Sequence, residues 1–212
     1  MKQAVGILGG TFDPVHNGHL RLAIECCEQL SLESVLLIPL DSPPHRNPPV
    51  ASAEHRLAML QLAARDISCL KVDDRELRRG GISYTVDTVR LLRKDMPDTP
   101  LFLITGNDAF NNIHTWHDWQ GIIEYVHIIV AGRPGQAVTN GKARAFLEKY
   151  RIDPSRLPVN SLAGNICEVE IPALDISSTR IREIIRDEKR PGGLIPDSIV
   201  DFIYSKRLYR ET

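Results

Sequence analysis

Two histidines, His16 and His19, stand three residues apart and follow a pair of glycines, Gly9 and Gly10. The glycines end a short apolar run that is typical of a buried strand, and a helical pattern of apolar residues begins at Leu20. The first N–H groups of a helix lack partners within the helix, and with the helix dipole they favour a bound anion. Because glycine also lets a phosphate approach the backbone closely, the two imidazoles predict chemistry on a phosphate group.

The spacing in this loop differs from that of two common nucleotide-binding loops. A dinucleotide-binding loop reads G-x-G-x-x-G, whereas Pro14 lengthens the loop here, and the sequence has no P-loop string G-x-x-x-x-G-K-[S/T]. Two other interpretations remain: a tight turn that leaves both histidines in solvent, and a zinc-binding pair. Zinc needs a third and a fourth ligand, and no other histidine or cysteine has a companion spacing. We therefore predict no metal held by protein side chains.

A second polar cluster opens a helical pattern near residue 180. Ser177, Ser178 and Thr179 come first, and Arg182 follows in the first turn. A serine N-cap with arginines in solvent would share this pattern. Hydroxyls, unpaired N–H groups and a guanidinium at one helix start are also well suited to polyphosphate oxygens. Two such helix starts in one chain favour a triphosphate over a monophosphate.

The segment from Gly9 to Leu20, GGTFDPVHNGHL, resembles the signature loop of the HxGH nucleotidyltransferases. Among these enzymes the chain is most similar to the bacterial nicotinate-nucleotide adenylyltransferases, and the resemblance extends from Gly6 to Tyr209. The further matching segments are PPHR at 43–46, SYT at 83–85, a G-x-D element at 106–108, a T-W pair at 115–116 and ISSTRIR at 176–182. The resemblance implies transfer of the adenylyl group of ATP to nicotinate mononucleotide, which yields deamido-NAD and pyrophosphate in NAD biosynthesis.

The resemblance also implies roles for the matching residues. The residues that act in catalysis are expected to be His16, His19 and Arg182. The expected ATP contacts are Gly9, Gly10, Thr11, Phe12, His16, His19, Asp108, Ser177, Ser178, Thr179 and Arg182. The expected contacts with the acceptor mononucleotide are His45, Arg46, Tyr84, Thr85 and Trp116. Mg²⁺ is expected as the cofactor, bound mainly through the phosphates of ATP.

Several of these assignments also have a purely structural interpretation. The proline-rich stretch around His45 and Arg46 fits a stiff surface loop as well as a phosphate contact. Thr85 is a plausible N-cap of the helix that follows it, and one residue can both cap a helix and line a pocket. Tryptophans are more often core residues than ligand platforms. We keep that interpretation for Trp119 and expect Trp116 to contact the pyridine ring.

The sequence is also compatible with three alternative functions. The acceptor could be nicotinamide mononucleotide, because a single carboxylate distinguishes it from the nicotinate form. It could be phosphopantetheine, although enzymes of that family usually carry threonine where this chain has His16, and they lack the PPHR and T-W elements. The chain could also be a non-catalytic nucleotide sensor, although a sensor does not need both imidazoles.

Strand-like and helical patterns alternate along the chain and predict the elements that position these residues. The expected strands are 4–8, 34–39, 67–72, 100–105, 126–131 and 168–171. The expected helices are 20–30, 52–64, 86–96, 139–151, 178–185 and 197–205. The charged tract 73–79 is expected to be a solvated edge or loop without a role. This order predicts an α/β fold: a doubly wound, mostly parallel, Rossmann-like nucleotidyltransferase sheet with helices on both faces.

Composition sets wider limits on the function. Lys and Arg number 26 against 27 Asp and Glu, a net charge of −1, so a nucleic-acid partner that relies on a basic field is not expected. No apolar run approaches the roughly 20 residues of a membrane span, and we expect a cytoplasmic protein without a membrane partner. Residues 1–212 are expected to form one domain with a helical part from about residue 175. A second copy of the chain, in a homo-oligomer, is among the partners considered. The four cysteines are expected to be reduced packing thiols.

Overall fold

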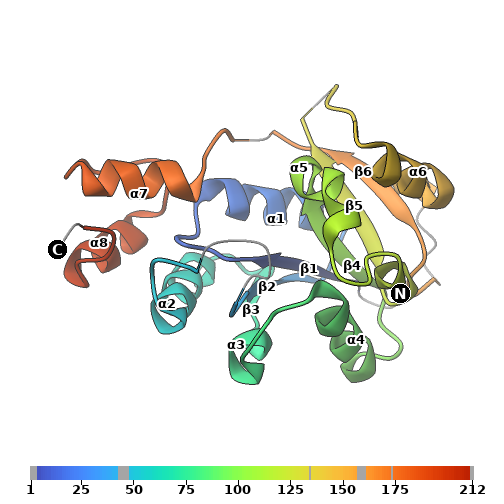
Figure 1. Ribbon diagram of the computed structural model, residues 1–212, viewed down its shortest axis with the longest axis horizontal. Coiled ribbons are helices and arrows are strands. Elements are labelled where there is room, and N and C mark those ends of the chain that lie inside the picture. The colour runs from blue at the N-terminus through green and yellow to red at the C-terminus, as the bar shows by residue number, and fades with distance from the viewer. Residues whose placement is uncertain (1–3, 43–47, 134, 157–160, 173, 211–212) are drawn as a thin grey trace.

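The computed structural model describes residues 4–42, 48–133, 135–156, 161–172 and 174–210. Its core is a six-stranded, all-parallel sheet with the strand order β3-β2-β1-β4-β5-β6 (Figure 1). The strands are β1 Val5–Gly10, β2 Ser34–Pro39, β3 Leu70–Val72, β4 Leu101–Gly106, β5 His127–Gly132 and β6 Ile166–Glu170. The predicted doubly wound, Rossmann-like fold is therefore confirmed.

Helices lie between the strands and after the last strand. The α-helices are α1 Asn17–Gln29, α2 Ala53–Ala64, α3 Arg75–Arg79, α4 Thr85–Asp95, α5 Asn107–Asn111, α6 Gly141–Tyr150, α7 Ser178–Arg186 and α8 Asp197–Ser205. Short 3₁₀ helices are η1 Ile113–Thr115, η2 Gly121–Glu124 and η3 Pro154–Arg156. In the part of the chain that is described, no helix is both long and apolar enough to cross a membrane.

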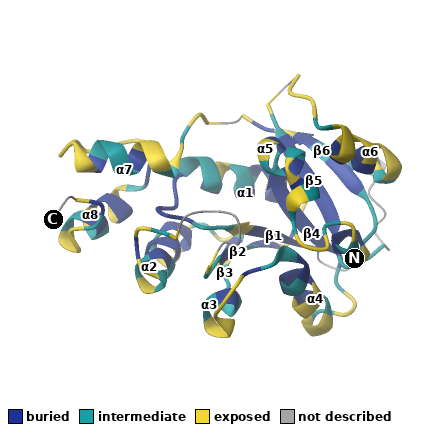
Figure 2. Cartoon of the chain, in the orientation of Figure 1, coloured by how far each residue is buried: buried dark blue, intermediate teal, exposed yellow. Residues whose placement is uncertain are grey.

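The sheet is buried on both faces, which explains why its strands are continuous apolar runs. Along β4, Phe102 and Ile104 join one apolar cluster, whereas Leu101 and Leu103 join another. The first cluster also takes apolar side chains from α1, α2, α7 and α8, and the second takes them from α4, α5 and α6. Helices thus cover both faces, with buried strands inside and exposed helix surfaces outside (Figure 2).

Two local predictions are wrong. The charged tract 73–79 contains helix α3, and Glu76 in it is only 3 % exposed. The charged neighbours of Glu76 stay at the surface, where Arg78 pairs with Asp74 four residues earlier. Thr85 is not the N-cap of α4: Tyr84 holds that position, and Thr85 is the first helical residue.

The strand order places a topological switch point between β1 and β4, because the chain winds outward from there in both directions. Ligands of such sheets bind at this point, beyond the carboxyl ends of the strands. The register pairs Ile7 with Leu103, and its continuation sets Gly10 level with Gly106. The loop after β1 and the start of α5 after β4 therefore flank the expected ligand crevice.

Candidate active site

The loop after β1 turns sharply at Phe12, which adopts a positive φ of 51°. Phe12 is 2 % exposed, and its ring packs edge-on against the His19 ring with the centroids 5.0 Å apart. A Cβ atom at Gly10 would lie 3.0 Å from the Phe12 ring, so glycine leaves the space that this packing needs. The Phe12 side chain therefore supports the loop from inside, and its backbone is the part left for a nucleotide.

The two histidines lie face to face at the start of α1. His16 is the N-cap residue, and its ring stacks on that of His19 with a centroid distance of 3.6 Å and an interplanar angle of 21°. The backbone N–H of His16 donates to Nδ1 of His19 at 3.3 Å. The sequence prediction that both imidazoles share the first turn is confirmed.

His16 is neutral at physiological pH. Its side chain is buried, and its Nδ1 has no hydrogen-bond partner among the described residues. This burial lowers the pKa of His16 to about 4, because an imidazolium would lose its hydration without gaining a counter-ion. A phosphate placed beside the ring would supply that counter-ion and favour the protonated form.

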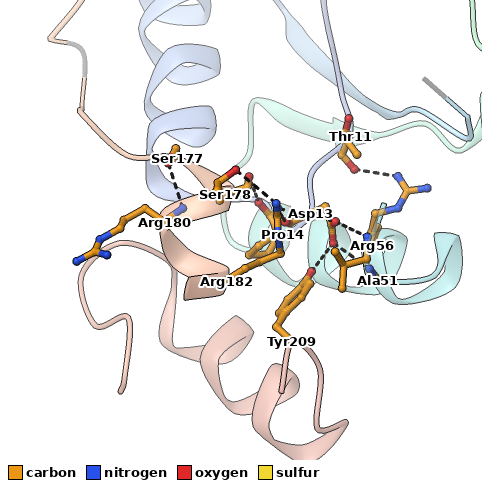
Figure 3. A network of polar contacts seen from close by, with 12 residues as sticks. Thr11, Asp13, Pro14, Ala51, Arg56, Ser177, Ser178, Arg180, Arg182 and Tyr209 are labelled. Atoms are coloured by element: carbon orange, nitrogen blue, oxygen red, sulfur yellow. Dashed lines mark hydrogen bonds and ion pairs between the residues drawn. The ribbon is translucent and has the colours of Figure 1, made fainter. Parts of the chain in front are cut away.

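Asp13 ties the loop to two distant segments (Figure 3). Its Oδ2 accepts a hydrogen bond from the N–H of Val50 at 2.7 Å, and its Oδ1 accepts one from the N–H of Ala51 at 3.1 Å. The hydroxyl of Tyr209, which follows α8, donates to the same Oδ1 at 2.7 Å. Because Asp13 is only 4 % exposed, these hydrogen bonds replace the water that its carboxylate has lost.

Arg56 of α2 joins the ends of β1 and β2. Its Nη1 donates to the carbonyl oxygens of Thr11 at 2.8 Å and of Leu40 at 2.7 Å. The side chain is almost completely buried, and burial lowers its pKa. A third N–H bond reaches the Asp41 carbonyl oxygen at 3.4 Å, and the buried guanidinium thus fixes both loop ends in one geometry.

The start of α7 lies against the same loop. Ser177 caps the helix by accepting a hydrogen bond from the N–H of Arg180 at 3.2 Å. Ser178 donates through its hydroxyl to the carbonyl oxygen of Pro14 at 2.9 Å, and Arg182 donates to that of Asp13 at 2.7 Å. A second N–H of Arg182 reaches the Thr179 hydroxyl at 3.4 Å.

These contacts bring the two predicted phosphate-type helix starts together (Figure 3). They also show that Ser178 and Arg182 hold the loop in addition to any ligand that they bind. Arg180, in contrast, pairs at the surface with Glu183 of its own helix. We refer below to the segment Gly9–Leu20 together with residues 177–182 as the phosphate side.

Two polar groups near the switch point remain available to a ligand. The Thr11 hydroxyl oxygen is buried without a hydrogen-bond partner among the described residues. The Asp108 side chain is exposed in the first turn of α5, at the carboxyl end of β4. Both lie beside the switch point.

The predicted acceptor contacts include two aromatic side chains, Tyr84 and Trp116. Tyr84 faces His117 with the ring centroids 4.5 Å apart, and Trp116 is half-buried over the apolar cluster beneath α4 and α5. Trp119 packs edge-on against Phe146 of α6, as expected for a core residue. We refer to Tyr84, Thr85, Trp116 and His117 as the acceptor side. The predicted contacts His45 and Arg46 lie outside the described residues.

A buried carboxyl group stands behind the acceptor side. Glu76 of α3 accepts a hydrogen bond from the Thr88 hydroxyl of α4, while its Oε2 lacks a partner among the described residues. Burial raises the pKa of Glu76. Nearby, the Ser83 hydroxyl accepts a hydrogen bond from the N–H of Asp41 at 3.2 Å, which links the loop after β2 to the start of α4.

Sequence reasoning missed Asp13, Arg56 and Tyr209. Asp13 lies inside the signature loop and was passed over because it has no partner nearby in the sequence. Arg56 gave a weak signal, as an arginine on the helix face that also carries the buried Met59 and Leu60. Within the described residues, no three His, Cys, Asp or Glu side chains come together as a set of metal ligands.

Comparison with known proteins assigns the chain to a family. The model of the cytidylyltransferase-like family matches residues 7–184. A probable nicotinate-nucleotide adenylyltransferase of Aeromonas salmonicida is 40 % identical over 211 residues, which cover 99 % of each chain. A protein of the same description from Methylococcus capsulatus is 41 % identical over 208 residues, covering 97 % of this chain and 99 % of the relative.

A solved structure supports the fold over the whole length. The nicotinic acid mononucleotide adenylyltransferase of Plasmodium falciparum, complexed with NaAD, superposes with a TM-score of 0.75. The alignment covers 98 % of this chain and 97 % of the other, at 17 % sequence identity. At this identity the likeness concerns the fold.

Proposed function

This chain belongs to the cytidylyltransferase-like family and, within it, to the nicotinate-nucleotide adenylyltransferases, and from that premise we propose that it joins ATP to nicotinate mononucleotide. The 5′-phosphate oxygen of the mononucleotide attacks the α-phosphorus of ATP, a new P–O bond forms, and the bond to the β-phosphate breaks. The products are deamido-NAD and pyrophosphate. Residues 1–212 act in this proposal as one catalytic unit.

The meeting of two helix starts on one loop is the observation that carries this proposal. Phosphoryl and nucleotidyl transfers need positioning and charge stabilisation more than a covalent nucleophile. The start of α1 supplies His16 and His19, and the start of α7 supplies Ser178 and Arg182 within hydrogen-bond reach of the same loop. Such an arrangement offers cationic and N–H donors to more than one phosphate at once.

Each group has a defined task in the proposed reaction. His16 and His19 contact the α- and β-phosphates and stabilise the negative charge that develops as pyrophosphate leaves. Arg182 and the backbone N–H groups at the start of α7 hold the leaving phosphates, with Ser177, Ser178 and Thr179 around them. Gly9, Gly10 and Thr11 border the nucleotide. Asp108, exposed beyond β4, contacts the adenosine part.

Recognition of the acceptor falls to the acceptor side. Trp116 and Tyr84 offer flat surfaces to the pyridine ring, and the N–H groups at the start of α4, around Thr85, face its carboxylate.

Mg²⁺ enters bound to the phosphates of ATP. The loop offers imidazoles and N–H groups, which suit phosphate oxygens, whereas Mg²⁺ prefers oxygen ligands and retains several waters.

Pyrophosphate release tests the proposed reaction. Purified protein is given ATP and Mg²⁺ with either nicotinate or nicotinamide mononucleotide, and His19→Ala is assayed beside the wild type. His55→Ala is the matched control, because the His55 ring packs edge-on against Phe202 on α8. We expect release with the nicotinate form, loss of about 10³-fold in His19→Ala, and little change in His55→Ala.

The other outcomes would each revise a different part of the proposal. Equal rates with both mononucleotides would retain the reaction and remove the carboxylate recognition at α4. An active His19→Ala variant would contradict the assigned chemistry. No release with either acceptor, while ATP still binds, would favour a nucleotide sensor.

A further inference from the structure

We propose that Tyr209, in the segment after α8, is a positioning residue for adenylyl transfer: its hydroxyl fixes Asp13 and thereby sets the place of His16 and His19. This inference rests on the proposed function. Tyr209 does not act on the substrate itself, because the observed partner of its hydroxyl is the carboxylate of the loop.

The contact between Tyr209 and Asp13 is short, buried and charge-assisted. The hydroxyl donates to Oδ1 at 2.7 Å, and both side chains are at most 9 % exposed. Burial and the neighbouring carboxylate both raise the pKa of Tyr209, so that the phenol keeps its proton and remains a donor. Hydrogen bonds of this kind are stronger and more directional than those between neutral groups.

The carboxylate of Asp13 loses the shorter of its two hydrogen bonds at Oδ1 when this donor is removed. Oδ2 is taken by the N–H of Val50, and Oδ1 would keep only the longer bond from Ala51 at 3.1 Å. The Nη1 atom of Arg182 lies 3.9 Å from Oδ2 and already donates to the Asp13 carbonyl oxygen. Without the phenol, the side chain of Asp13 can rotate toward Arg182, and the loop loses one of its fixed points.

A shift at Asp13 reaches the histidines through a stiff connection. Pro14 and Val15, both buried, are the only residues between Asp13 and His16, and the ring of Pro14 restricts its own backbone. The Pro14 carbonyl oxygen is also held by Ser178. His16 in turn stacks on His19 at 3.6 Å. A displacement at Asp13 therefore changes the alignment of both rings instead of dissipating in a flexible loop.

The backbone at Tyr209 is also held in an uncommon conformation. Tyr209 has a φ of 64°, in the left-handed region that non-glycine residues seldom occupy. Such backbone persists only where surrounding contacts over-determine it, and it is frequent at functional sites. Tyr204, only five residues earlier, makes a surface contact instead, in which its hydroxyl donates to the carbonyl oxygen of Lys189 at 3.0 Å.

Tyr209→Phe tests the inference, with Tyr204→Phe as the matched control. Both changes remove one hydroxyl and keep the aromatic ring within the same region of the chain. Steady-state rates of pyrophosphate release give kcat and the KM values for ATP and nicotinate mononucleotide. In parallel, the imidazole nitrogen signals of His16 and His19 are followed by NMR, with those of His117 and His127 as references.

We expect kcat of Tyr209→Phe to fall about tenfold with KM values within about twofold, because misplaced catalytic groups lower the rate of the chemical step. The His16 and His19 signals should shift while those of His117 and His127 stay in place. Tyr204→Phe should retain kcat within about twofold, since the bond that it removes is exposed and weak. In an Asp13→Asn background, Tyr209→Phe should add little, because the acceptor of the hydroxyl is already impaired.

The opposite results would overturn the inference. If Tyr209→Phe unfolds at a lower temperature but keeps both kcat and the His16 and His19 signals, the tyrosine only stabilises the fold. Additive losses in the Asp13→Asn background would also contradict it. If the wild type itself releases no pyrophosphate, the proposed function fails, and the imidazole signals alone then decide whether Tyr209 positions the loop.

Discussion

Around Asp13, one carboxylate accepts hydrogen bonds from three donors in two distant segments, whereas around Tyr84 and Trp116 the side-chain contacts are between rings and apolar groups. The phosphate side is thus held by directional bonds, and the acceptor side by flat surfaces. The difference matches the two tasks. A reacting phosphorus needs groups placed to within a fraction of an ångström, whereas a planar ring is bound by contact area and tolerates small lateral shifts.

This comparison predicts that changes on the phosphate side lower kcat and that changes on the acceptor side raise the KM for the mononucleotide. The largest effect is expected for His16→Ala, which removes one of the two stacked rings. We expect kcat to fall about 10³-fold, as for the loss of one donor to a developing charge, with little change in the KM for ATP. A higher KM for ATP with an unchanged kcat would instead make His16 a binding residue. The two sides would then no longer differ in the kinetic constant that they control.

The burial of His16 should also be visible in the stability of the free protein. Its pKa is about 4 in the folded chain and near 6.5 when unfolded, so the unfolded state binds more protons between these values. Stability should therefore decrease as the pH falls from 6.5 to 4, by about 3 kcal/mol in total from this group. Urea unfolding across this range measures the effect, and His16→Gln should show a correspondingly shallower decrease. If the free energy of unfolding falls equally steeply with pH in the wild type and in His16→Gln, His16 is hydrated in solution.

On the acceptor side, Trp116→Ala should act on binding. We expect the KM for nicotinate mononucleotide to rise about tenfold, the order found when an aromatic platform under a base is removed, while kcat and the KM for ATP remain near those of the wild type. Trp119→Ala is the matched tryptophan control: it removes a core contact with Phe146 and should lower the melting temperature instead. A fall in kcat for Trp116→Ala would break the proposed division between the two sides.

The smallest effect is expected at Glu76, the buried carboxyl group behind the acceptor side. Burial raises its pKa in the folded chain, so the folded state holds a proton that the unfolded state releases once the pH exceeds about 4.5. Stability therefore decreases as the pH rises through this window. Glu76→Gln cannot release that proton, and its stability relative to the wild type should grow between pH 5 and pH 8. Parallel stability curves would show that Glu76 is already ionised at pH 5.

Much of the fold was predictable from the sequence because the strands are buried on both faces. Continuous apolar runs such as 34–39 leave few alternatives, and β2 spans those same residues. The prediction that the tract 73–79 is solvated was wrong because its buried residue, Glu76, is itself charged. The hydroxyl partner of Glu76, Thr88, lies on a different helix. Thr85 was misplaced by one position, which is the usual uncertainty of helix starts.

The phosphate side was predictable only in part, because some of its contacts join residues that lie far apart in the sequence. His16 and His19 lie three residues apart, so their proximity follows from helix geometry alone. The contacts of Asp13 with Tyr209 and of Arg56 with Thr11 join residues 196 and 45 positions apart, and spacing rules do not reach that far. The roles of the ligand-binding residues, including Asp108 and Thr179, remain predictions that the assays above address.

The wide separation between Asp13 and Tyr209 has a consequence for the chain during synthesis. The phenol partner of Asp13 is synthesised 196 residues after Asp13 itself. At 5–20 residues per second this takes roughly 10 to 40 s. Throughout that time the nascent chain carries both histidines without the last bond that fixes their loop. On the proposal above, the two histidines reach their final alignment only once the segment after α8 has emerged.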